Sequence, residues 1–181
     1  MYKSILNEEA VYYDFINCPK GFEINREEIK HGIMYGYINN KHVQNKQYPV
    51  EHHLHLDYLN SYITDFVKLK ENFKLEIFLK EKFSYILNHN EKIERKNHFD
   101  SFNIQDSPTY VLIYGIELEE KSSNLIIHHS YKKTPNSTRT IPMQNNKFIM
   151  FPAHLDYEIT NNTSKLNGFY LVNLYHEASC S

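Results

Sequence analysis

The sequence contains no tryptophan, only two cysteines and very little net charge, and each shortage excludes a class of protein. Cys18 and Cys180 lie near opposite ends of the chain, so they cannot form a disulfide framework, and we expect a reducing, cytoplasmic location. A formal net charge of −2 provides no basic surface for nucleic acid or for an anionic membrane. No apolar run is long enough to cross a bilayer, and the first residues do not form a secretory signal. We therefore expect a soluble protein with no nucleic-acid or membrane partner.

The length and the apolar content predict a single domain. A chain of 181 residues with 41% apolar side chains suffices for one domain with its own core, and not for two ordinary ones. We expect that domain to span residues 1–181, with N-terminal strands and a supporting helix over 1–82 and a β-rich core over 83–181. The sequence contains no indication of an oligomeric state.

Hydrophobic spacing predicts one helix clearly. From His55 to Phe73, apolar residues recur at steps of three and four with polar residues between them, which is typical of an amphipathic helix. The first fifty residues mix short apolar runs with turn signals, so we expect irregular short strands and loops there. Residues 83–88 have the composition of a strand, whereas residues 75–82 give a mixed signal.

After about residue 98 the pattern changes to short strands without helices. Residues 109–116 form a nearly continuous β-branched and aromatic run, which predicts a central strand buried on both faces. Other strands are predicted over residues 124–129, 147–152, 157–160 and 169–175. Short strands separated by Asn, Ser, Pro and Gly predict a β-sandwich or barrel. The expected fold class is therefore β-rich α+β, with a jelly-roll core and a supporting helical layer.

Eleven histidines are the main chemical resource of the chain. The three histidines between Glu51 and Asp57 are better explained by solvated side chains at the start of a helix than by a metal site. His128 and His129 follow one another in a predicted strand, so their rings must face opposite sides of the sheet. Neither group forms a recognisable ligand set on its own.

The segment His98-Phe99-Asp100 differs from the other histidine groups because it pairs an imidazole with a carboxylate. On a strand, positions i and i+2 place both side chains on one face. A histidine and a carboxylate are two of the three ligands of the 2-His-1-carboxylate facial triad, which leaves positions of Fe(II) open for substrate and oxygen. The pair is expected to open into the interior of the barrel.

The segments around this pair follow a known order. Tyr85 begins an aromatic strand before His98, residues 112–116 and 122–127 match the two strands that come next, and Phe151-Pro152 ends a later strand. In this order the chain resembles the Fe(II)/2-oxoglutarate-dependent dioxygenase superfamily, especially its prolyl-hydroxylase-like branch and the small oxygenases common in phage genomes. The resemblance covers roughly residues 83–176 and the preceding helix. It implies a double-stranded β-helix, with Fe(II) and 2-oxoglutarate as cofactors.

The resemblance also implies a set of metal ligands, and here the chain departs from the family. His98 and Asp100 match the first two ligands, but Tyr157 stands where the family has its distal histidine. His154, which lies three residues earlier in the same predicted turn, is the alternative third ligand.

The arginine that binds the distal carboxylate of 2-oxoglutarate in the family is also missing. The start of the last strand offers Lys165 instead, which can act as a point charge but not as a bidentate fork. Arg139 is a more remote candidate for this role. Tyr114 matches a position where the family often hydrogen-bonds the cosubstrate.

Three functional hypotheses follow. The first is an Fe(II)/2-oxoglutarate-dependent oxygenase that hydroxylates a small molecule or a peptide side chain. The second is a catalytically degenerate jelly roll that acts as a binding or structural module, because a fold does not imply a function. The third is a metal-binding cupin-like enzyme that uses histidines from the His128-His129 strand.

Overall fold

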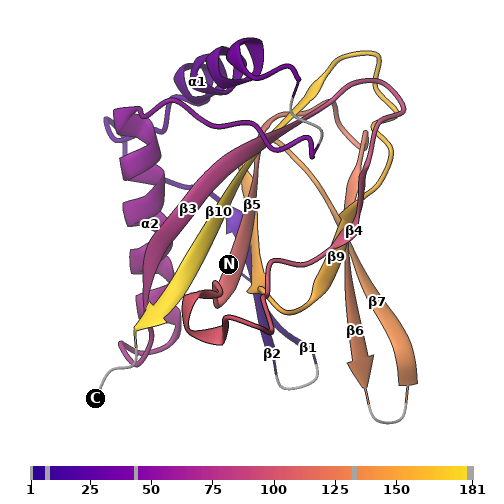
Figure 1. The fold of residues 1–181 in the computed structure, drawn as a ribbon. Helices are drawn as coiled ribbons and strands as arrows, with labels where there is room; N and C mark the ends of the chain where they lie inside the picture. The colour runs from indigo at the N-terminus through magenta and orange to yellow at the C-terminus, as the bar shows by residue number, and fades with distance from the viewer. Residues whose placement is uncertain (1, 7–8, 43–44, 132–133, 179–181) are drawn as a thin grey trace.

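The computed structural model describes residues 2–6, 9–42, 45–131 and 134–178. Figure 1 shows two helices on one side of a curved array of strands. In chain order the elements are β1 (Tyr2–Leu6), β2 (Glu9–Phe15), α1 (Arg26–Asn39), α2 (Leu54–Lys70), β3 (Glu76–Leu87), β4 (Ile93–Lys96), a short 3-10 turn (Ile104–Asp106), β5 (Tyr110–Glu117), β6 (Asn124–Tyr131), β7 (Thr134–Pro142), β8 (Lys147–Pro152), β9 (Asp156–Ile159) and β10 (Gly168–Ala178).

The strands form two antiparallel sheets that face each other. The larger sheet has the order β1-β2-β8-β5-β10-β3, and the smaller has the order β4-β9-β6-β7. Consecutive strands of the chain repeatedly cross from one sheet to the other, which is the connectivity of a jelly roll. The prediction of a β-rich α+β fold with a jelly-roll core and a supporting helical layer is therefore confirmed.

The larger sheet separates two hydrophobic cores. One, which we call the barrel core, lies between the two sheets and contains Val111, Ile113 and the rings of Tyr85 and Tyr157. The other, the helix-side core, lies between the larger sheet and the two helices (Figure 1). The prediction that β5 is a central strand buried on both faces is confirmed, because its alternate residues enter the two cores.

Helix α2 confirms the predicted amphipathic helix within a few residues at each end. Leu59, Ile63 and Phe66 are buried at steps of three and four, and they contribute to the helix-side core. The His53 side chain accepts a hydrogen bond from the His55 N–H at the start of this helix. Among the residues that the structure describes, no helix has both the length and the hydropathy needed to cross a membrane.

Helix α1 corrects the expectation of irregular structure over the first fifty residues. Asn25 caps the helix by accepting hydrogen bonds from the N–H groups of Glu27 and Glu28. Two interior glycines weaken the helical signal in the sequence. Gly36 is nevertheless required, because a Cβ there would lie 1.7 Å from the Pro49 carbonyl oxygen.

The strands predicted after residue 98 are present as β5, β6, β8, β9 and β10. The mixed signal over residues 75–82 resolves into the first half of one long strand, β3. Strands β4 and β7 were not predicted: β4 has only four residues, and β7 contains Pro, Asn and Ser, which are typical of turns.

Candidate functional site

The predicted ligand pair lies in a loop and not on a strand, which corrects the expectation from its spacing. β4 ends at Lys96, and the next four residues have no regular secondary structure. The loop is fixed by backbone and side-chain contacts: the His98 N–H donates to the Ala153 carbonyl at 3.2 Å, and the Asn97 amide donates to Asp156 at 2.7 Å. These contacts hold His98 beside the turn between β8 and β9.

A chain of hydrogen bonds joins His98 to two buried tyrosines of the barrel core. The Tyr157 hydroxyl on β9 lies 2.8 Å from His98 Nε2 and 2.8 Å from the Tyr85 hydroxyl on β3. Both phenols are fully buried. The planes of the His98 and Tyr157 rings are inclined by 26°, with their centroids 5.7 Å apart. Tyr157, which stands in place of the distal histidine, thus contacts His98 directly.

Burial fixes the protonation states in this chain. It raises the pKa of the Tyr157 phenol well above its usual value, and the neighbouring Tyr85 reinforces the shift. Burial, with the nearby charge of Lys96, lowers the pKa of His98 to about 4. At neutral pH the imidazole is therefore uncharged and the phenol keeps its proton, so Tyr157 can donate its hydrogen bond to Nε2.

Asp100 lies close to His98 but is engaged in a local turn. Its side chain is exposed, and Oδ1 accepts a hydrogen bond of 2.9 Å from the Phe102 N–H. His98 and Asp100 both line a cavity of about 220 Å³ at one end of the barrel, together with Lys80, Glu81, Asn103, Asp106, Ser107, Pro108 and Leu174. The structure thus brings these two predicted residues to one cavity.

The other candidate ligand and the cosubstrate candidates lie elsewhere. His154 is exposed in the turn between β8 and β9. Tyr114 belongs to the helix-side core, where its hydroxyl donates to Asn146 Oδ1 at 2.7 Å. Lys165 is exposed in the turn before β10, and the Arg139 guanidinium donates to the Tyr13 hydroxyl at 3.0 Å. None of these four residues lines the cavity that His98 and Asp100 share.

The residues around His98 do not fit an Fe(II) centre as they stand. Iron would need the Nε2 lone pair, and a protonated phenol that can donate to this nitrogen lies 2.8 Å away. Within the part of the chain that the structure describes, no three His, Cys, Asp or Glu side chains are grouped as metal ligands. A neutral phenol is a poor substitute for the second histidine of a facial triad, because metal ligands must be deprotonated.

Sequence reasoning did not single out Lys96, which lies beside this chain. Lys96 on β4 pairs with Tyr157 on β9, so both side chains point to the same face of the smaller sheet. Its ammonium lies 4.7 Å from the centroid of the Tyr85 ring. Burial lowers the pKa of Lys96 to about 8. The sequence did carry a sign that Lys96 lies near this chain, because only one residue separates Lys96 from His98.

The remaining histidine groups have structural partners. His52 and His53 lie within 3.5 Å of the carboxylates of Asp57 and Glu28 at the start of α2. His128 Nε2 lies 3.4 Å from Glu158 on the adjacent strand, outside the barrel core. The expectation of helix-start histidines is confirmed.

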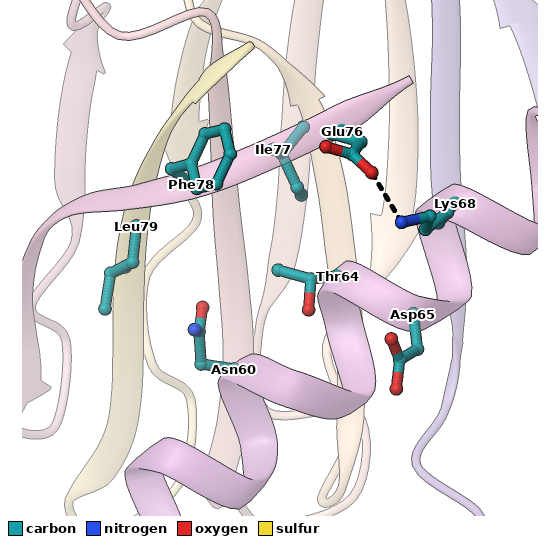
Figure 2. Close-up of a pocket in the computed structure, with 8 residues that line it drawn as sticks. All are labelled: Asn60, Thr64, Asp65, Lys68, Glu76, Ile77, Phe78 and Leu79. Carbon is teal, nitrogen blue, oxygen red and sulfur yellow. Dashed lines mark hydrogen bonds and ion pairs between the residues drawn. The ribbon is translucent and has the colours of Figure 1, made fainter. Parts of the chain in front are cut away.

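A separate cavity of about 330 Å³ lies outside the barrel, between α2 and β3 (Figure 2). Figure 2 shows Asn60, Thr64, Asp65 and Lys68 on α2, which runs beside the first residues of β3. Lys68 already pairs with Glu76 across the cavity. The cavity contains none of the residues of the His98 chain.

Comparison with solved structures identifies the fold. The chain matches the viral collagen prolyl hydroxylase vCPH from Paramecium Bursaria Chlorella virus-1, solved as a 2OG complex, at a TM-score of 0.61 and 12% identity, covering 92% of this chain and 96% of that one. A prolyl hydroxylase from Trichoplax adhaerens, in complex with a hypoxia inducible factor peptide fragment, matches at a TM-score of 0.61 and 10% identity over 91% and 83% of the two chains. The fold is that of the 2OG-Fe(II) oxygenases.

A third neighbour is longer than this chain. An oxidoreductase of the 2OG-Fe(II) oxygenase family from Burkholderia pseudomallei matches at a TM-score of 0.53 and 11% identity, over 73% of this chain and 61% of its own length. No protein-family model matches the sequence, and no curated protein does. At these identities the neighbours define the fold, and the chemistry must be argued from the residues of this chain.

Proposed function

We propose that this chain is a binding protein built on the 2OG-Fe(II) oxygenase fold, in which a hydrogen-bonded tyrosine has replaced the iron centre. The contact of the Tyr157 hydroxyl with His98 Nε2 carries this proposal. The contact occupies the ring nitrogen that a metal would need, and it is buried in the barrel core. The ligand is a small molecule or a peptide, as for the peptide-bound neighbour of the same fold.

The hydrogen-bond chain supports this proposal because it leaves few polar groups of the barrel core unsatisfied. The Tyr85 hydroxyl lies 2.8 Å from the Tyr157 hydroxyl and can donate to it. Tyr157 can then donate to the neutral imidazole of His98. Buried polar groups are costly without partners, so this arrangement stabilises the protein without a metal.

A second candidate, an Fe(II)/2-oxoglutarate-dependent oxygenase acting on a small molecule or a peptide side chain, is favoured by one observation. His98 and Asp100 line the same cavity and are the right residue types for two ligands. His154 or Tyr157 would have to supply the third ligand. Tyr114, Lys165 or Arg139 would have to bind 2-oxoglutarate, which supplies the electrons for oxygen activation when it is bound.

Thermal melting with Mn(II), an inert substitute for Fe(II), separates the two candidates. For the binding protein, Mn(II) causes no rise in the melting temperature of the parent beyond that seen with 2-oxoglutarate alone. A metal that binds only the folded state would stabilise it by about 2.7 kcal/mol at a hundredfold excess over Kd. A shift in the parent that is lost in His98→Ala would establish the oxygenase instead.

The substitution Tyr157→His provides a positive control, because it restores the histidine of the facial triad. We expect this variant to gain a Mn(II)-dependent increase in melting temperature that the parent lacks. Tyr170→Phe is the matched control, since Tyr170 is another buried tyrosine of the barrel core, bonded to Ser123 and not to His98. It should remain insensitive to Mn(II).

A further inference from the structure

A pocket of about 600 Å³ lies along β4, beside the His98 chain but separate from the cavity at His98 and Asp100. One wall is the segment Asn45–Lys46, and the other is the turn into β4 and the strand itself, residues 90–96. A volume of about 300–1,000 Å³ is typical of sites for small organic ligands. The pocket is therefore large enough for a small molecule and not only for an ion.

The charges of this pocket are unbalanced. Three of its cations are paired with carboxylates: Lys46 with Glu91 at 3.6 Å, Lys92 with Glu94 at 3.2 Å and Arg95 with Asp156 at 2.8 Å. Lys96 is the fourth cation. Over the described ranges of the chain, no carboxylate lies within ion-pair distance of its ammonium.

Lys96 is not an ordinary surface lysine. It is half-buried, and its ammonium lies over the face of the Tyr85 ring. A cation–π contact of this kind compensates only part of the lost hydration of a charge. Lys96 is thus a partly dehydrated cation without a counterion, with which an anion entering the pocket can pair.

The walls around Lys96 are held in place by other contacts. Tyr48 and Ser84 exchange backbone hydrogen bonds of 3.0 and 2.8 Å, which fix the segment that carries Lys46 to β3. On the other side, β4 is paired with β9. A site whose walls are already ordered loses little entropy when a ligand binds.

We propose that this pocket binds a small organic anion, whose carboxylate or phosphate group pairs with the Lys96 ammonium. The inference rests on the proposed binding function, to which it gives a ligand class. Lys46 and Arg95 also line the pocket, but Glu91 and Asp156 already offset their charges, so Lys96 supplies the positive charge that pairs with the ligand. The ligand would bind beside the Tyr85–Tyr157–His98 chain and would not require a metal.

The experiment follows melting of the chelator-treated protein at constant ionic strength, with succinate, with inorganic phosphate and with the uncharged succinamide. We expect a saturable increase in melting temperature with at least one of the two anions and none with succinamide. Comparison of succinate with phosphate tells which oxyanion the pocket prefers. If neither anion raises the melting temperature more than chloride does, the proposal is wrong.

Two substitutions locate the binding. Lys96→Met should weaken anion binding at least tenfold and should melt no lower than the parent without ligand, because it removes a half-buried charge that has no counterion. Lys96→Arg should retain binding. Lys74→Met is the matched control, since Lys74 is exposed and lies outside the pocket. Equal weakening by Lys96→Met and Lys74→Met would overturn the assignment to this pocket.

Nuclear magnetic resonance of the parent keeps the proposal testable if Lys96→Met does not fold. Succinate or phosphate should shift the amide signals of residues 45–47 and 93–96 more than those of other segments. Shifts confined to other segments would reject the pocket. The Mn(II) test is independent of the anion test. If the protein binds both Mn(II) and the anions, only the proposed loss of the iron centre is rejected. If it binds neither, only the anion pocket is rejected.

Discussion

The single hydroxyl of Tyr157 connects two polar groups that otherwise have few partners in the barrel core. We expect Tyr157→Phe to lower the free energy of unfolding by about 1–3 kcal/mol, because it removes a partner from both the Tyr85 hydroxyl and His98 Nε2. Urea denaturation measures this change. The double variant Tyr85→Phe/Tyr157→Phe should cost less than the sum of the single variants, since it also removes one of the groups left unpaired.

Tyr35→Phe is the control for the general effect of losing a tyrosine hydroxyl. Tyr35 lies on α1, and its side chain is 58% exposed. Its substitution should change stability by less than about 0.5 kcal/mol. A similarly small effect for Tyr157→Phe would contradict the structural role assigned to the hydrogen-bond chain.

His98 makes stability depend on pH in a defined direction. Its pKa is about 4 in the folded protein, below the ordinary value near 6.5 that it regains on unfolding. Between these values the unfolded chain binds a proton that the folded chain does not, so stability falls as pH is lowered through this range. The His98 contribution is complete above about pH 6.5 and is lost by about pH 4, at a cost of at most about 3 kcal/mol.

Denaturation of the parent and of His98→Gln between pH 7 and pH 4 measures this contribution. The carboxylates titrate in both proteins, so the difference between the two curves isolates His98. We expect the parent to lose more stability than the variant as pH falls. Parallel curves would mean that His98 has an ordinary pKa in the folded protein.

At the scale of elements, α1 depends on one close approach that only glycine permits. A Cβ at Gly36 would lie 1.7 Å from the Pro49 carbonyl oxygen, so α1 or the segment that contains Pro49 would have to move. We expect Gly36→Ala to destabilise the protein by about 1–3 kcal/mol, although alanine favours helices. Thermal or urea denaturation measures the loss.

His31→Ala tests the same helix without the close contact. His31 is exposed on α1, so alanine there should leave stability unchanged or raise it slightly. If Gly36→Ala behaved in the same way, the contact between α1 and Pro49 would not be a constraint on the fold.

The elements that could be predicted from the sequence are those whose own residues carry a hydrophobic pattern typical of a helix or a strand. The three- and four-residue spacing of α2 and the apolar run of β5 are local signals, and both predictions were correct. The glycines of α1 obscure its pattern, because they serve a contact with a distant segment. Strand β4 is too short to carry a periodic signal, and its pairing with β9 shifts in register.

The same limit applies to the candidate site. The sequence pointed to His98 and Asp100, and the structure places both at one cavity. The contact between His98 and Tyr157 joins residues 59 positions apart, and it depends on how β4 and β9 align. The roles suggested for Tyr114, Lys165, Arg139 and His154 came from the resemblance alone, and they stay predictions.

At the scale of the whole molecule, the larger sheet supports both cores, so β5 should be the least tolerant part of the fold. Leu112 is fully buried in the helix-side core, on a strand paired with β8 on one side and β10 on the other. Leu112→Asp would place an unpaired carboxylate there, and we expect it to cost at least about 3 kcal/mol and to lower the melting temperature sharply. Leu166→Asp, at a side chain that is 66% exposed, is the control and should melt like the parent. If Leu112→Asp also melted like the parent, β5 could not be the strand on which both cores are built. Because α1 and α2 pack on the helix-side core, disruption of that core should unfold both helices together. The helical circular dichroism signal should then be lost in the same transition as that of the sheet.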